Sequence, residues 1–241
     1  MQYRNLGKSG LKVSEIGLGG SSFGREIGEE QSISLIHYAF HLGINFVDTA
    51  NFYNEGHSEE FIGRAIKDRR SEVIISTKFG APISENPNDG GGSRYNILQA
   101  LEGSLKRLGT DYIDLYYIHW PDATTPLEET LRTLDNLVRA GKVRYIGCSN
   151  FPAWQLCEAL WISKVNNLES FAVVESRYNV LDDRRIESEL VPCCQTHGIG
   201  VVPYEALAGG FLVLCRDMWL TPGQLPSPYA CTSQVVRLQT G

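Results

Sequence analysis

Short apolar runs and longer stretches of helical periodicity follow one another along this chain. The apolar runs are a few residues long and end at polar residues or glycine. Runs of this kind are typical of strands that are buried on both faces of a parallel sheet. They predict seven strands, at residues 15–18, 44–47, 73–77, 113–118, 143–148, 171–174 and 199–202.

Three segments between these strands have the spacing of an amphipathic helix. One lies around residues 33–40, and a second at 97–108 is stopped by Gly109. A third begins near Thr125, which we expect to cap the helix, with Pro126 at the first helical position and Glu128 closing a capping box. Leu127, Leu131, Leu134 and Val138 form the apolar stripe that we expect to be buried, and Gly141 ends the helix.

The alternation of strands and helices predicts a (β/α) barrel. An open, doubly wound sheet would give a similar pattern. Polar residues follow several of the strands, and no GxGxxG turn is present, so the barrel is favoured.

Composition narrows the class of protein. At 241 residues and 42% hydrophobic content, the chain can bury one large core. A net charge of −6 argues against a nucleic-acid partner. We expect no membrane span and no signal peptide, and therefore a cytoplasmic protein. The six cysteines show no CxxC or Cys/His spacing for zinc, so we expect reduced thiols and no metal site.

Four polar residues come directly or shortly after three of the apolar runs, namely Asp48, Tyr53, Lys78 and His119. In a parallel α/β protein the carboxyl ends of the strands carry the chemistry. Taken singly, each has another explanation: Asp48 could cap a loop, Tyr53 could be ordinary packing and His119 could be a satisfied core histidine. Together they predict a proton-transfer site.

Reversible proton transfer to a carbonyl oxygen is the chemistry that needs this set. A tyrosine with an ordinary pKa of about 10 is an acid at neutral pH but a poor base. A neighbouring Lys78 ammonium is expected to lower the pKa of Tyr53, and Asp48 to keep Lys78 charged. His119 would add a directional hydrogen bond to the same oxygen.

The chain resembles the aldo-keto reductases, whose Asp, Tyr, Lys and His tetrad matches these four residues in identity, order and strand placement. The similarity is almost continuous over residues 1–212. It includes the segments 3–14, 48–50 with Tyr53, 56–60, 118–122, 147–151, 177–179, 203–204 and 207–210. Several motifs in one order are a more specific signal than any short pattern alone.

The resemblance implies a (β/α)8 TIM-barrel type of fold and reversible, NADP(H)-dependent reduction of an aldehyde or ketone. It makes Tyr53 the general acid/base, Lys78 the modulator of its pKa, Asp48 the partner of Lys78, and His119 the group that orients the carbonyl. The implied cofactor contacts are Gly20, Ser21, Asp48, Ser149, Asn150, Glu175, Tyr204, Leu207 and Gly209. The implied substrate contacts are Phe23, Tyr53, His119 and Trp120.

Two departures from the family pattern point to weaker cofactor binding. Glu175 stands where the family usually has glutamine, and an ionised carboxylate cannot donate a hydrogen bond to the nicotinamide carboxamide. Glu205 is expected to bring negative charge toward the cofactor phosphates. The glycine cluster at 17–24 is by itself as consistent with a tight turn as with cofactor binding.

The largest departure begins after residue 212. The eighth strand and the segments that hold the adenosine end and the 2′-phosphate are expected to be missing or replaced. We therefore predict a barrel at 1–212 and a divergent tail at 213–241, with an open sheet edge that could favour a homo-oligomer.

The expected activity is that of an oxidoreductase acting on a small carbonyl or alcohol substrate. The alternative is a catalytically impaired or non-enzymatic relative that binds cofactor weakly, or an interaction subunit such as the channel-associated β subunits of this family.

Overall fold

The structure is a computed structural model that describes residues 1–181, 186–212 and 235–237. Its strands are β1 Tyr3–Asn5, β2 Lys12–Ser14, β3 Ile16–Gly19, β4 Phe46–Asp48, β5 Ile74–Phe79, β6 Ile113–Ile118, β7 Val143–Ser149, β8 Val173–Arg177, β9 Gly200–Tyr204 and β10 Val235–Arg237. Its helices are α1 Glu29–His41, α2 His57–Ile66, α3 Arg94–Leu108, α4 Leu127–Arg139, α5 Ala153–Asn166 and α6 Val191–His197. Short helical turns lie at Tyr53–Gly56, Arg70–Glu72, Ile186–Leu190 and Ala208–Gly210.

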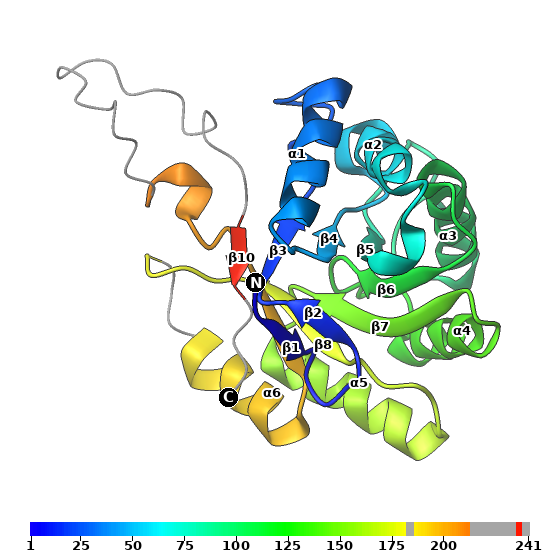
Figure 1. The fold of residues 1–241 in the computed structure, drawn as a ribbon. Helices are drawn as coiled ribbons and strands as arrows, with labels where there is room; N and C mark the ends of the chain where they lie inside the picture. The colour runs from blue at the N-terminus through cyan, green and yellow to red at the C-terminus, as the bar shows by residue number, and fades with distance from the viewer. Residues whose placement is uncertain (182–185, 213–234, 238–241) are drawn as a thin grey trace, which may run out of the picture.

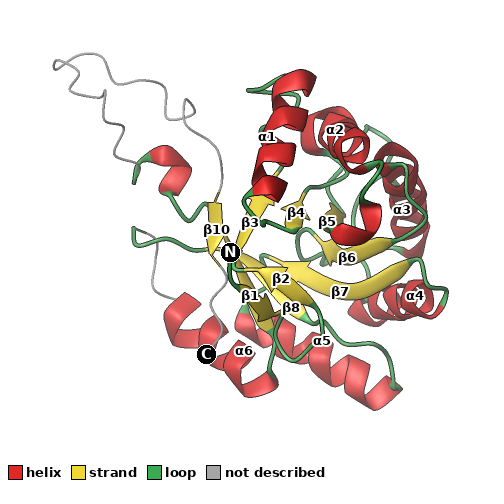
Figure 2. Ribbon diagram, viewed as in Figure 1, coloured by secondary structure: helices red, strands yellow, loops and turns green. Residues whose placement is uncertain are grey.

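Strands β3 to β9 form a parallel sheet in chain order, and the sheet is curled like part of a barrel. The helices lie along its outer side (Figure 1 and Figure 2). All seven predicted strands are present, with ends that differ by at most three residues. The (β/α) barrel type of fold is confirmed, because the connections between neighbouring parallel strands all cross the same outer face of the sheet.

The last described strand, β10, pairs with β3 in the antiparallel direction. Val235 lies opposite Leu18, and Arg237 lies opposite Ile16. In the family pattern a parallel eighth strand would lie beside β3. Here the antiparallel β10 takes that place, so the outer edge of β3 is not open. The rest of the tail predicted at 213–241 lies outside the described residues.

Helix α4 corrects one detail of the sequence prediction. It begins at Leu127, with Pro126 as N-cap and no hydrogen bond from a capping side chain. The capping box predicted for Thr125 and Glu128 is wrong, because the Thr125 side chain instead donates to the carboxylate of Asp122. Of the predicted stripe, Leu131 and Leu134 are fully buried, whereas Leu127 and Val138 are half-buried against the core.

Helices α2, α5 and α6 were not predicted from the pattern. Helix α6 has only seven residues, which is too short to show a clear period. Helix α5 carries large apolar side chains on its exposed side as well, including Trp154 and Trp161, so that no single apolar stripe stands out.

The apolar core has two parts that lie on opposite faces of the sheet. The larger part packs between the strands and the helices. The smaller part fills the concave side and consists of Leu6, Val13, Phe46, Leu115, Tyr117, Val173 and Val202. The β1–β2 hairpin closes this side at the amino ends of the strands, where the loop N–H of Lys8 donates to Gly198 O at 2.8 Å. The carboxyl ends are thus the side left for a site.

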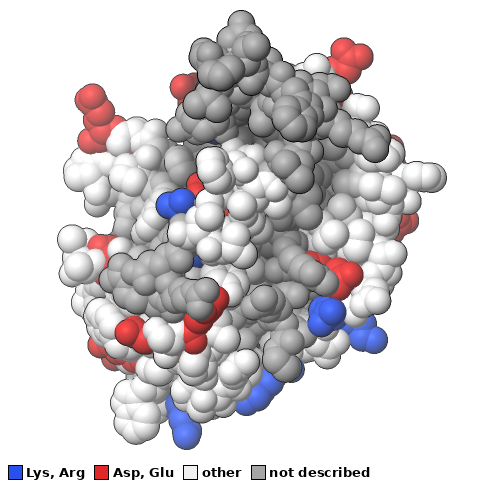
Figure 3. All heavy atoms as spheres, turned by 90° about the vertical axis from the view of Figure 1, so that its left-hand side faces the viewer, with Lys and Arg blue, Asp and Glu red and all other residues white. Residues whose placement is uncertain are grey.

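The described surface carries charges of both signs. Figure 3 shows acidic and basic side chains on the same face, without a broad basic patch among the residues drawn in colour. Within the described part of the chain, every helix is too short or too polar to cross a membrane.

Candidate active site

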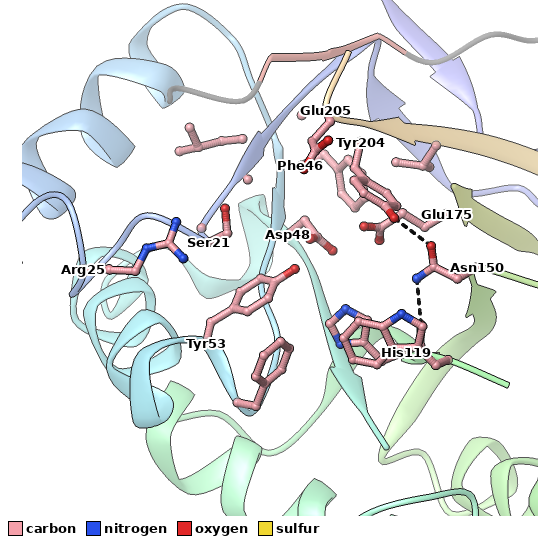
Figure 4. A pocket seen from close by; sticks show the side chains of 17 residues that line it. Ser21, Arg25, Phe46, Asp48, Tyr53, His119, Asn150, Glu175, Tyr204 and Glu205 are labelled. Carbon is pink, nitrogen blue, oxygen red and sulfur yellow. Dashed lines mark hydrogen bonds between the residues drawn. The ribbon is translucent and has the colours of Figure 1, made fainter. Parts of the chain in front are cut away.

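A cavity of about 310 Å³ opens at the carboxyl ends of the parallel strands. Figure 4 shows side chains from widely separated parts of the sequence pointing into it. The cavity is lined by Gly17, Leu18, Gly19, Gly20, Ser21, Arg25, Phe46, Asp48, Phe52, Tyr53, His119, Trp120, Asn150, Glu175, Val202, Tyr204 and Glu205.

Lys78 and Asp48 form a buried ion pair beneath this cavity. Lys78 projects from β5 and is completely buried, and its ammonium contacts the Asp48 carboxylate and donates to Thr49 O at 3.0 Å. Ser76 fixes the other carboxylate oxygen of Asp48 with a 2.6 Å hydrogen bond. Burial by itself lowers the pKa of Lys78, but the carboxylates of Asp48 and Glu175 outweigh it and raise that pKa, so the ammonium stays charged.

Tyr53 lies in the helical turn that follows β4, at the wall of the cavity. The Lys78 ammonium is 5.3 Å from the centre of its ring. Burial raises the pKa of Tyr53, and the lowering effect of Lys78 does not offset it because Asp48 and Glu175 add negative charge. The expectation of a lowered pKa is therefore wrong for this structure, and Tyr53 is a neutral phenol at neutral pH.

His119 follows β6 and is part of an aromatic wall. Its ring stacks on Trp120 with centroids 3.8 Å apart and meets the edge of Tyr53 at 5.9 Å. Burial and the nearby Lys78 ammonium lower the pKa of His119 to about 2, so its imidazole is neutral. Nδ1 is buried and has no hydrogen-bond partner among the described residues. A neutral imidazole with an unused nitrogen can hydrogen bond to a ligand oxygen.

Glu175 lies in the middle of β8 and is the second carboxyl group near Lys78. One of its oxygens lies 3.3 Å from Nζ of Lys78, yet that oxygen makes no well-aligned hydrogen bond within the described chain. Burial and the Asp48 carboxylate raise the pKa of Glu175 to about 8, while Lys78 lowers it. Glu175 is thus protonated at neutral pH and can donate as well as accept. The expectation that Glu175 only accepts is corrected at this pH.

Asn150 and Tyr204 are joined across the cavity. The Tyr204 hydroxyl donates to Asn150 Oδ1 at 2.8 Å, and Asn150 Nδ2 donates to His119 O at 3.0 Å, as the dashed lines in Figure 4 show. Asn150 has a φ of 61°, the left-handed conformation that asparagine tolerates. Ser149 precedes it and is buried, with its hydroxyl accepting from Asn150 Nδ2. These residues meet at one place, as the sequence predicted.

Gly20 and Ser21 also line the cavity, and the packing around Gly20 explains why this position is a glycine. A Cβ atom at Gly20 would lie 2.6 Å from Ser58 Oγ and 3.1 Å from Asp48 O. Any side chain here would therefore push the β3 loop away from the α2 N-terminus.

Four of the predicted contact residues are not part of the cavity lining, namely Phe23, Ser149, Leu207 and Gly209. Phe23 is 1% exposed and belongs to the large core, because the loop after β3 folds back and turns the ring inward. Its expected contact with substrate is therefore not formed here. Leu207 and Gly209 lie at the turn after β9 and are not part of the cavity lining.

Several cavity residues were missed by the sequence analysis. Phe52 packs against His119 and Trp120, and Arg25 stands at the rim in an ion pair with Glu26. Only the position of Phe52 beside Tyr53 hinted at a role. The expected negative charge of Glu205 is balanced, because Arg177 contacts its carboxylate at 2.9 Å.

A comparison with protein families matches residues 15–217 to the model of the Aldo/keto reductase family. This chain belongs to the aldo/keto reductase family.

Relatives of this aldo/keto reductase carry different names. A probable voltage-gated potassium channel subunit beta from Oryza sativa subsp. japonica is 40% identical over 218 residues, which cover 88% of this chain and 66% of that protein. An uncharacterized oxidoreductase of Bacillus subtilis is 40% identical over 224 residues, covering 88% and 68%. The versiconal hemiacetal acetate reductase of Aspergillus parasiticus is 38% identical over 238 residues, covering 88% and 69%. The chain thus spans about two thirds of the length of these relatives.

Proposed function

We propose that this protein reversibly reduces an aldehyde or ketone to an alcohol with hydride from NADPH. The observation that carries the proposal is the neutral phenol of Tyr53, placed at a small cavity between the Lys78 ammonium and the neutral imidazole of His119. A bound nicotinamide would supply the hydride. The residues of the chain supply the proton and hold the carbonyl group.

The residues around the cavity fit a nicotinamide. Tyr204 offers a ring face at one wall, and Asn150 offers an amide group at another, with the buried Ser149 hydroxyl accepting a hydrogen bond from that amide. The protonated carboxyl of Glu175 can both donate and accept, as the glutamine usual at this position can, but with one O–H donor in place of two N–H donors. One of its oxygens lies beside the Lys78 ammonium, and Glu175 also lines the cavity. These four residues would hold the carboxamide and the ring.

Tyr53 would donate its proton to the carbonyl oxygen as hydride reaches the carbon. Its raised pKa keeps that proton in place at neutral pH, when reduction needs an acid. The phenolate that forms is stabilised by the Lys78 ammonium, which Asp48 and Thr49 O hold in position. His119 would donate an N–H hydrogen bond to the same oxygen and thereby orient the carbonyl.

The proposal is tested with the full chain, NADPH and a panel of aliphatic and aromatic aldehydes and ketones, following NADPH consumption. We expect turnover that falls by on the order of 10² to 10⁴ in Tyr53→Phe, the effect of removing a general acid. Tyr38→Phe is the matched control, because Tyr38 is an exposed tyrosine on α1 outside the cavity. Equal turnover of wild type and Tyr53→Phe would contradict the proposal.

A second candidate function is a non-enzymatic or impaired binding subunit. The similarity to probable potassium channel β subunits from Oryza sativa and Arabidopsis thaliana, each at 40% identity, favours it. Binding of NADPH without turnover of any carbonyl in the panel would support this function over the first.

A further inference from the structure

A cluster of soft metal ligands lies on the outer helices, apart from the cavity. Cys157 belongs to α5, and Cys193 and His197 belong to α6. Their ligand atoms all lie within 4.8 Å of one another. None of the three residues lines the cavity, so the proposed carbonyl reduction does not use them.

The two helices bring these ligands together in different ways. Cys193 and His197 are four residues apart on α6, a spacing that places two side chains on one face of a helix. Cys157 comes from the neighbouring helix, and its Sγ is 3.2 Å from Sγ of Cys193. Cys193 Sγ also lies 3.9 Å from the carbonyl oxygen of Ala153, one turn before Cys157. The trio therefore sits at the contact between α5 and α6.

The geometry is close to that of a tetrahedral zinc site. With Zn–S distances of about 2.3 Å, two thiolates on one zinc ion lie roughly 3.8 Å apart. The observed sulfur separation would widen by about half an ångström, which rotation of two partly exposed side chains can provide. Two thiolates and one imidazole form a ligand set that suits zinc and does not suit magnesium or calcium.

We propose that Cys157, Cys193 and His197 bind a Zn²⁺ ion, with water as the fourth ligand. Cys157 and His197 are exposed and Cys193 is half-buried, so an ion can enter from solution and a water can reach the fourth position. The sequence alone did not predict this site, because Cys157 lies 36 positions before Cys193. The four-residue spacing of Cys193 and His197 was the one signal in the sequence that could have indicated a metal site.

A bound ion would tie α6 to α5. Helix α6 leads through Gly198 into β9, which carries Tyr204 at the cavity. The ion would thus stabilise the folded protein, because it would bind the folded chain in preference to the unfolded chain.

The test uses the full chain, reduced with a phosphine and freed of metal by chelation. Zinc binding is measured by competition with a chromophoric chelator, and Co²⁺ absorption reports whether thiolates coordinate. Cys157→Ser and His197→Gln each remove one ligand from an exposed position. Gln195→Ala changes an exposed α6 residue outside the cluster. A Cys215→Ser/Cys231→Ser chain removes the two tail cysteines, which lie outside the described residues.

We expect one zinc ion per chain and a thiolate-to-cobalt absorption band. Affinity should fall by about a hundredfold or more in Cys157→Ser and His197→Gln. It should be unchanged in Gln195→Ala and in the tail double variant. Zinc, but not magnesium, should raise the midpoint of thermal unfolding.

Three results would overturn the proposal. They are the absence of zinc binding by the reduced chain, zinc binding that survives loss of Cys157 and of His197, and zinc binding that depends on the tail cysteines. A Cys157–Cys193 disulfide detected by intact mass in a chain that binds no zinc after reduction would point to an oxidisable pair instead.

Discussion

The carboxyl group of Glu175 lies 3.3 Å from the ammonium of Lys78, which also contacts the Asp48 carboxylate. Two acidic side chains therefore share one buried cation. Like charges at close range cannot both ionise without cost, so one of them keeps its proton. Burial and Asp48 raise the pKa of Glu175 to about 8, which makes Glu175 the protonated member near neutral pH.

The first prediction concerns the pH dependence of cofactor binding. Glu175 is a hydrogen-bond donor below its pKa of about 8 and loses that proton as the pH rises through it. NADPH affinity of the wild type should therefore fall between pH 7 and 9, whereas that of Glu175→Gln should not. One lost hydrogen bond of about 0.5–1.5 kcal/mol corresponds to a change of a few-fold. Fluorescence titration at both pH values measures it.

The control for this prediction is Glu205→Gln, a second glutamate-to-glutamine change at the cavity. Because Glu205 is paired with Arg177, its replacement should leave the fall between pH 7 and 9 in place. Parallel pH profiles of the wild type and Glu175→Gln would show that Glu175 does not control the affinity.

The second prediction concerns the stability of the buried charges. Lys78→Met leaves Asp48 and Glu175 buried without their cation. Loss of one partner from a buried ion pair costs about 3–5 kcal/mol in the free energy of unfolding. Urea unfolding at pH 7 should show this loss, and a smaller one in Lys78→Met/Asp48→Asn, where the unpaired carboxylate is also removed. Strictly additive losses would mean that the two side chains are not coupled.

The third prediction concerns the charge of His119. With its pKa lowered to about 2 by burial and Lys78, its imidazole is neutral across the range in which the protein is folded. In spectra of histidine-labelled protein, the ring signal that disappears in His119→Gln should keep its chemical shift from pH 5 to 8. A titration of that signal near pH 6.5 would show an environment more open to water than this structure has.

The fourth prediction concerns the choice of cofactor. Arg25 is the only Lys or Arg among the described cavity-lining residues, and it contacts Glu26. Recognition of a 2′-phosphate needs cationic or hydrogen-bonding groups placed at that phosphate. Paired titrations should therefore give a preference for NADPH over NADH below about tenfold, or about 1.4 kcal/mol. A preference far above this would locate a phosphate site in the tail.

The sequence by itself determined the parallel strands and the place of the site. Buried strands are continuous apolar runs, and residues at their carboxyl ends meet at one edge whatever the details of packing. Asp48, Lys78 and His119 could therefore be assigned to one site before the structure was known. The family resemblance added Ser149, Asn150 and Tyr204, which are joined by hydrogen bonds through Asn150.

Only the tertiary structure decided the protonation of the site, the course of the loops and the second cluster of ligands. The pKa values of Tyr53 and Glu175 depend on burial and on charges brought together from separate strands, and no sequence spacing records either. The inward turn of Phe23 depends on how its loop packs. The meeting of Cys157 with Cys193 depends on the contact between two helices, which the sequence places far apart.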